Sequence, residues 1–171
     1  MTARFDLIFA AAAAEVGHGI EPELLKAIAW RESSLDPSAS RYGRAERRAY
    51  RKAYQRWRRH GVRFWLDHPL SERGDILWRS FGLMQVLYVV AVEVGYPVDA
   101  DPEGLYDPEV NVRMGARHFR RCLNKAGNIS SAISLYNAGR IQIDPATGHF
   151  PNQSYVDSVM RMRDRLMSAN G

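Results

Sequence analysis

The sequence has little of what usually cross-links, chelates or anchors a protein. Cys122 is the single cysteine among 171 residues, so no disulfide can form within the chain. The five histidines are scattered without the spacing of metal ligands, and no glycine-rich phosphate loop is present. No apolar run approaches the length that crosses a bilayer. We therefore expect no metal, no cofactor and no membrane-spanning segment.

The N-terminal apolar stretch is too short to act as a secretion signal. Arg4 precedes an apolar run that ends in the alanines of 10–14, which imitates a signal peptide, but Asp6 interrupts its start. Cleavage after those alanines would also remove an expected first helix. We predict no cleaved signal, so a substrate outside the cytoplasm would require delivery of the protein by another route.

The totals fit one soluble globular domain over 1–171. Hydrophobic residues make up 46% of the chain and charged residues 25%, which is ordinary for such a domain. The formal net charge is +5. A positive balance favours a polyanionic partner, such as nucleic acid, an anionic membrane surface or an acidic cell-wall polymer.

The positive charge is concentrated between residues 41 and 63. This stretch holds ten of the 24 basic residues, and Tyr50, Tyr54 and Trp57 recur within it at helical spacing. We favour a solvated basic helix that docks through its aromatic seam; a patch for a polyanion or for single-stranded nucleic acid is the alternative. No nucleic-acid-binding signature surrounds the stretch. Residues 61–79 are irregular and predict a short hairpin.

Hydrophobic periodicity and capping residues predict a mainly α protein of about seven helices. Pro22 is a favoured first helical residue, the Asp-Pro at 107–108 is a helix start, and Gly139 is a helix stop. The stretch 82–94 is apolar on nearly every side and predicts a central helix capped by Ser80. The expected helices span 3–16, 22–34, 41–63, 82–94, 108–125, 129–138 and 153–167.

One helix carries a carboxylate where an apolar residue is expected. Leu24, Leu25 and Ile28 form an apolar face, and Glu32 falls on that face four residues after Ile28. The Asp-Pro at 36–37 then ends the helix. Burial and the negative end of the helix dipole both raise the pKa of such a carboxyl, as a general acid requires. On this segment alone, a solvated glutamate in a last helical turn is the commoner explanation.

Two further polar residues interrupt apolar helices. Gln85 lies in the apolar stretch, where a lone amide can be a satisfied core residue. Asn137 stands near the end of another expected helix, where it can serve the helix stop. Each residue alone is a weak signal. The information lies in the order and spacing of three short motifs: Glu32-Ser33, Gly82-Leu83-Met84-Gln85 and Tyr136-Asn137-Ala138-Gly139.

This set resembles the soluble lytic transglycosylase family, which shares the goose-type lysozyme fold. Residues 25–33 are similar to the family's catalytic helix, 107–117 to its packing helix and 152–156 to the start of its closing helix. The resemblance covers most of the chain and implies a mainly α, lysozyme-like domain. In the family, Gly-Leu-Met-Gln comes soon after Glu-Ser, whereas here residues 41–79 are inserted between them. Such an insertion resembles transglycosylases encoded by phages and prophages, which would suit a virion-borne enzyme.

The resemblance implies that the partner is the glycan strand of peptidoglycan in the periplasm or cell wall. The bond cut would be the β-1,4 link between N-acetylmuramic acid and N-acetylglucosamine, with catalysis on Glu32. The implied supporting residues are Ser33, Gly82 and Gly139, and the implied substrate-binding residues are Met84, Gln85, Tyr136, Asn137 and Tyr155. For the insertion we expect a role in roofing the groove, gripping acidic wall polymer or docking on a larger assembly.

Our mechanistic hypothesis uses one carboxyl. Glu32 protonates the glycosidic oxygen, the substrate's N-acetyl group stabilises C1, and Glu32 then takes the C6 hydroxyl proton to leave a 1,6-anhydro end. Three alternatives stay open. A goose-type muramidase would need a second acid, Asp36 or Asp75, to hold water. A basic nucleic-acid-binding protein would use 41–63, and an inactive relic would bind the wall without cutting it.

Overall fold

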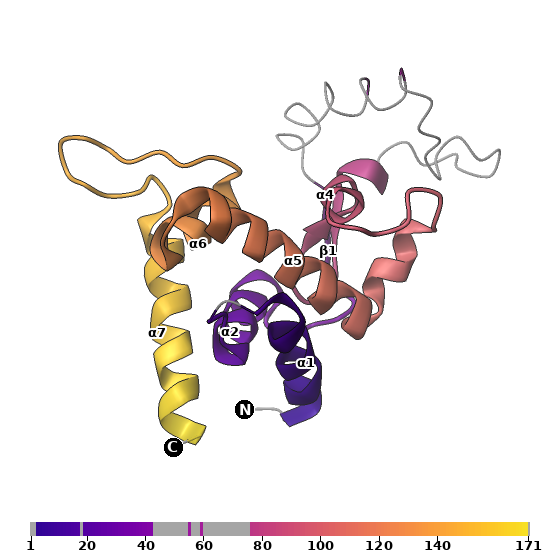
Figure 1. The fold of residues 1–171 in the computed structure, drawn as a ribbon, viewed down its shortest axis with the longest axis horizontal. Helices are drawn as coiled ribbons and strands as arrows, with labels where there is room; N and C mark the ends of the chain where they lie inside the picture. Colours follow the sequence, from indigo (N-terminus) through magenta and orange to yellow (C-terminus); the bar gives the residue numbers. More distant parts are fainter. Residues whose placement is uncertain (1–2, 18, 43–54, 56–58, 60–75, 171) are drawn as a thin grey trace.

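Helices dominate the protein, as the sequence predicts. The computed structural model describes residues 3–17, 19–42, 55, 59 and 76–170 (Figure 1). The described residues form six α-helices: α1 (Asp6–Val16), α2 (Pro22–Ser33), α4 (Tyr88–Glu93), α5 (Pro108–Ala126), α6 (Ile129–Ala138) and α7 (Gln153–Asn170). They also form 3-10 turns at Ala3–Phe5, Ile76–Trp78 and Pro102–Tyr106. Among these helices, none is long and apolar enough to span a bilayer.

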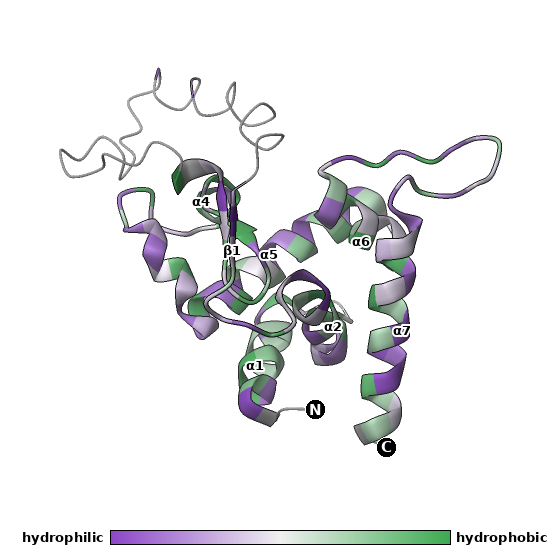
Figure 2. Cartoon of the chain, turned by 180° about the vertical axis from the view of Figure 1, so that it is seen from behind, coloured by the Kyte–Doolittle hydropathy of each residue, from purple (hydrophilic) through white to green (hydrophobic). Residues whose placement is uncertain are grey.

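Helix α2 occupies the centre and packs against α1 and α7. Leu24, Leu25 and Ile28 on its apolar face have no exposed surface, which matches the predicted inward face. Burial of each such side chain contributes about 1.5–3 kcal/mol to stability. In Figure 2 the ribbon of α7 alternates between purple and green, as expected for a helix with one buried face, and α1 is largely green. Lys26 forms an ion pair with Asp6, which ties α2 to α1.

The helix ends follow the predicted capping residues. The Asp107 carboxylate accepts a hydrogen bond from the Val110 amide at 2.9 Å at the start of α5. The Asn128 side chain accepts one from Ser131 N at 2.9 Å at the start of α6. Gly139 ends α6 at a φ of +69°, a conformation that glycine adopts without strain. These local interactions explain why the boundaries of α5 and α6 can be predicted.

The predicted helix over 82–94 is wrong in its first half. Residues 82–85 form a turn between two strands, and α4 begins only at Tyr88. Gly82 and Gln85 have φ angles of +67° and +47°, which lie outside the helical region. The side-chain amide of Gln85 donates to the backbone oxygens of Gly82 at 2.9 Å and Ala39 at 3.0 Å. These bonds stabilise the turn, and Ser80 lies in a strand rather than at a helix cap.

A small antiparallel sheet holds this turn in place. Its strands are β1 (Ser40–Tyr42), β2 (Arg79–Phe81) and β3 (Val86–Leu87), in the order β1-β2-β3. Arg41 pairs with Ser80, so the chain leaves and re-enters the described structure on neighbouring strands. The helix predicted over 41–63 and the hairpin predicted over 61–79 lie mainly outside the described residues. At their edges, Arg41 and Tyr42 are in β1 and 76–78 form a 3-10 turn.

A fully buried asparagine on α5 connects the helical core to the turn. Asn111 Oδ1 accepts a hydrogen bond from Met84 N at 2.8 Å, and its Nδ2 donates to Phe81 O at 2.7 Å and Leu105 O at 2.8 Å. A Cβ at Gly82 would lie 2.6 Å from Asn111 Nδ2, so this position has no room for a side chain. The turn and α5 are therefore fitted to one another through backbone and amide groups.

Candidate active site

The structure brings Glu32 into contact with a tyrosine 123 residues later in the chain. Glu32 lies in the last turn of α2, partly buried, and Ser34 follows it in a left-handed conformation that ends the helix. Tyr155, in the first turn of α7, donates its hydroxyl to Glu32 Oε1 at 2.6 Å. Only 6% of Tyr155 is exposed, so this hydrogen bond is shielded from water.

The surroundings of Glu32 raise the pKa of its carboxyl. Burial has the largest effect and disfavours the ionised form. The opposing influences are smaller: the Tyr155 hydrogen bond comes first, followed by the charges of Arg41 and Arg31 and a side-chain hydrogen bond with Asn137. Since the net shift is upward, a larger fraction of Glu32 stays protonated as the pH approaches neutrality. A carboxyl of this kind can give a proton to a bound oxygen and afterwards take one back.

Two tyrosines near Glu32 are held as neutral donors. Burial and the charge of Glu32 raise the pKa of both Tyr136 and Tyr155 well above the ordinary value. Tyr136, on α6, donates its hydroxyl to Met84 O at 2.9 Å, which joins α6 to the 82–85 turn. Its ring lies 4.9 Å from the ring of His118 on α5. Burial lowers the pKa of His118 to about 3, so that ring is a neutral packing surface.

An exposed arginine covers the tyrosine that contacts Glu32. The Arg31 guanidinium carbon lies 5.4 Å from the centroid of the Tyr155 ring, within the range of a cation–π contact. Arg31 precedes Glu32 on α2, so its charge acts on both partners of the Tyr155–Glu32 hydrogen bond. The positive charge lowers the pKa of each group and partly offsets the effect of burial.

Asn137 adds a second polar group beside the carboxyl. It lies in the last turn of α6, is exposed, and its side chain lowers the pKa of Glu32, though less than Tyr155 does. Its Oδ1 accepts a hydrogen bond from Asn152 Nδ2 at 3.0 Å. Glu32 of α2, Asn137 of α6 and Tyr155 of α7 therefore meet at one point, and these are three of the predicted site residues.

The other predicted site residues lie in or against the supporting framework. Ser33 donates its hydroxyl to Leu83 O at 2.8 Å and so attaches the end of α2 to the 82–85 turn. Met84 is fully buried, and its sulfur occupies the space in which a Cβ at Gly115 would stand. Gln85 uses its amide within the turn and accepts a hydrogen bond from Ser80 Oγ at 3.0 Å. The structure thus places the Met84 and Gln85 side chains against protein groups.

The two acids considered as water-holding partners differ in what the structure describes. Asp36 is exposed and accepts hydrogen bonds from Ser38 N at 2.9 Å and Ser38 Oγ at 2.7 Å, which lower its pKa. This is the arrangement of a turn residue that bonds to its own backbone. Asp75 lies outside the described residues.

Two residues that hold this site together lie in stretches similar to the family's packing and closing helices, but neither of them was assigned a role from the sequence. Asn111 anchors the turn from α5, and Asn152 joins the start of α7 to α6. Asn152 stands just before α7, where asparagine commonly caps a helix. A capping asparagine is the usual expectation there, so the sequence carried no signal of its bonds to α6.

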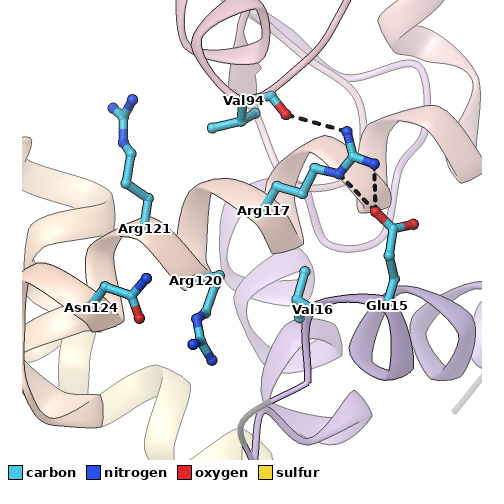
Figure 3. Close-up of a pocket in the computed structure, with 7 residues that line it drawn as sticks. All are labelled: Glu15, Val16, Val94, Arg117, Arg120, Arg121 and Asn124. Carbon is cyan, nitrogen blue, oxygen red and sulfur yellow. Dashed lines mark hydrogen bonds and ion pairs between the residues drawn. The ribbon is translucent and has the colours of Figure 1, made fainter.

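A shallow pocket of about 390 Å³ lies at a different place, between α1, α5 and the end of α4 (Figure 3). Arg117 donates there to Glu15 at 2.7 Å and to Val94 O at 3.3 Å. The pocket is lined by Glu15, Val16, Val94, Arg117, Arg120, Arg121 and Asn124. None of the predicted site residues lines it.

A comparison with protein-family models identifies the framework that holds these residues. The model described as the transglycosylase SLT domain matches residues 9–155. The match includes Glu32, the 82–85 turn, Asn137 and Tyr155. It supports lytic transglycosylase activity on peptidoglycan and agrees with the mainly helical, lysozyme-like fold. The chain belongs to the transglycosylase SLT domain family.

Proposed function

We propose that this protein cleaves the β-1,4 bond between N-acetylmuramic acid and N-acetylglucosamine and forms 1,6-anhydro-N-acetylmuramic acid, with Glu32 as acid and then base. One observation carries the proposal: the partly buried Glu32 carboxyl, whose pKa is raised, accepts a hydrogen bond from the Tyr155 hydroxyl at 2.6 Å. The family supplies the substrate class, peptidoglycan.

In the first step, protonated Glu32 gives its proton to the glycosidic oxygen. The bond from C1 to that oxygen breaks, and N-acetylglucosamine leaves with a hydroxyl group. The carbonyl oxygen of the substrate's own N-acetyl group bonds to C1 and takes up the positive charge. Substrate assistance of this kind replaces the second carboxylate that most glycosidases use. Substrate assistance suits this site because the Asp36 carboxylate accepts hydrogen bonds from Ser38.

In the second step, ionised Glu32 takes the proton from the C6 hydroxyl of the muramoyl residue. The C6 oxygen then attacks C1, and the bond between C1 and the N-acetyl oxygen opens. Glu32 ends protonated, so the cycle closes without consuming water. Between the two steps the carboxylate is charged, and the donors on Tyr155 and Asn137 stabilise that form.

The products distinguish this reaction from hydrolysis. We expect mass spectrometry of digested peptidoglycan to detect muropeptides with 1,6-anhydro ends. A goose-type muramidase would instead leave reducing ends, one water heavier. If reducing ends were the primary product and appeared as fast as the glycosidic bonds were cut, the proposal would be contradicted. The muramidase alternative would then be favoured.

Loss of the Tyr155 hydroxyl should slow cleavage and shift its pH dependence. Activity requires protonated Glu32, so kcat/KM falls as the pH rises through the pKa of Glu32. Tyr155→Phe removes a donor that lowers this pKa, so the alkaline fall in activity should move to higher pH. One hydrogen bond to a charged group is worth about 1.5–3 kcal/mol, which corresponds to a loss of about tenfold or more in rate.

A matched variant separates this effect from lost stability. Tyr96 donates its hydroxyl to Asp101 O at 2.6 Å, in a segment that contains no predicted site residue. Tyr96→Phe should lower the melting temperature and leave the pH profile of cleavage in place. If Tyr96→Phe shifted the pH profile of cleavage as much as Tyr155→Phe does, a specific role for Tyr155 would be contradicted.

A further inference from the structure

We propose that Asn152 is a positioning residue, which holds the Asn137 side chain so that its NH2 group, rather than its oxygen, faces Glu32. The inference rests on the proposed role of Glu32. It adds to the site a residue that does not itself contact the carboxyl, and it explains how an exposed amide can keep one orientation.

The hydrogen bonds of Asn152 leave its side-chain amide one arrangement. Nδ2 donates to Ser134 O at 3.1 Å and to Asn137 Oδ1 at 3.0 Å, and Oδ1 accepts from Ser134 Oγ at 2.7 Å. If oxygen and nitrogen were exchanged, the Asn152 oxygen would face the carbonyl oxygen of Ser134, and two acceptors would repel. Ser134 is 1% exposed, so water cannot relieve such a mismatch.

The fixed Asn152 amide in turn determines the orientation of Asn137. Since Asn137 Oδ1 accepts from Asn152, the Nδ2 group is the part of the amide left to face Glu32, and the Asn137 side chain lowers the pKa of that carboxyl as a donor would. A reversed Asn137 would set its oxygen against the carboxylate and its NH2 against another NH2. The backbone oxygen of Ser134 thus fixes the Asn152 amide, and Asn152 fixes the Asn137 amide that faces Glu32.

The backbone of α7 does not depend on the Asn152 side chain. The backbone oxygen of Asn152 accepts from Tyr155 N at 2.9 Å and from Val156 N at 3.3 Å, which begins the helix. The side chain turns instead to α6. If the role of the Asn152 side chain were purely structural, its loss would only weaken the attachment of α7 to α6. In the positioning role, its loss also changes the environment of the Glu32 carboxyl through Asn137.

The two roles are distinguished by a double-mutant cycle read from the pH profile of kcat/KM. Asn137→Ala removes a group that lowers the pKa of Glu32, so this pKa should rise and the alkaline fall in activity should move to higher pH. Asn152→Ser should move it in the same direction, and in the Asn137→Ala background it should add nothing. Every variant keeps the other groups that interact with Glu32, which belong to Tyr155, Tyr136, Arg31 and Arg41.

Controls make each outcome decisive. Ser134→Ala removes the hydroxyl that donates to Asn152 but keeps the backbone oxygen that fixes the Asn152 amide, and it leaves the Asn152–Asn137 bond. It should therefore lower the melting temperature without moving the profile. An unmoved profile in Asn152→Ser, or an equal shift with and without Asn137, would overturn the proposal. If Asn152→Ser does not fold, Asn152→Asp takes its place in the same cycle. The added charge acts both with and without Asn137, so the cycle subtracts its direct effect on Glu32. Cleavage by Glu32→Gln would refute the proposed function itself, whatever the cycle gives.

Discussion

Glu32→Gln should reduce cleavage of peptidoglycan by about 10²–10⁴-fold, the range that a positioned general acid contributes. Glutamine has nearly the same shape and can still accept the Tyr155 hydroxyl, but its amide cannot donate a proton at neutral pH or take one from C6. Removal of a partly buried carboxyl should also leave the melting temperature unchanged or higher. Release of soluble muropeptides and thermal unfolding measure the two effects separately.

A second acid serves as the control for this result. Asp36→Asn changes an exposed carboxylate four residues away in sequence, whose hydrogen bonds go to Ser38. Under the one-carboxyl mechanism, cleavage by Asp36→Asn should equal that of the unmodified protein. If Glu32→Gln kept full activity, the assignment of Glu32 would be wrong. If both variants lost activity, a two-acid hydrolytic mechanism would be favoured.

The largest effect on stability is expected from Asn111→Ala. The substitution removes three hydrogen bonds in the interior and leaves Met84 N, Phe81 O and Leu105 O without their partner. An unpaired buried polar group costs about 1–3 kcal/mol, so the free energy of unfolding should fall by about 3 kcal/mol or more. For a chain of this size, the melting temperature should fall by roughly 10 °C.

An exposed asparagine on the same helix gives the comparison. Asn124 is solvent-exposed near the end of α5, and Asn124→Ala should change the melting temperature little. Asn111→Ala should also lose activity at temperatures where it stays folded, since the turn beside α2 is released from α5. Equal stability of the two variants would mean that the buried amide contributes nothing net to the fold.

The features that could be predicted from the sequence are those set by neighbouring residues. Asp107, Asn128 and Gly139 act within one helical turn of themselves, so the limits of α5 and α6 follow from local chemistry. The inward face of α2 follows from the spacing of its leucines. The meeting of Glu32 with Asn137 and Tyr155 was implied by the family resemblance, and the structure brings these three side chains together.

The features that could not be predicted depend on contacts between distant parts of the chain. The stretch 82–87 is apolar enough to be helical, but Asn111, 27 residues beyond Met84, holds it as a turn. Gln85 also reaches back to Ala39 across the sheet. In the same way, the partners of Asn152 lie on a helix that ends before a long exposed loop. No local preference in the sequence reports such pairings.

The pairing of β1 with β2 has a consequence for the length of chain that can lie between them. Because Tyr42 faces Arg79 across two hydrogen-bonded strands, the residues between them start and finish at adjacent points. The entropy of closing a connection grows only slowly with its length, by about 0.6 kcal/mol for each doubling. Segments of very different size can therefore be accepted between these two strands during evolution while Glu32, Ser33 and the 82–85 turn keep their arrangement. The paired strands therefore form a connection point that tolerates segments of different length.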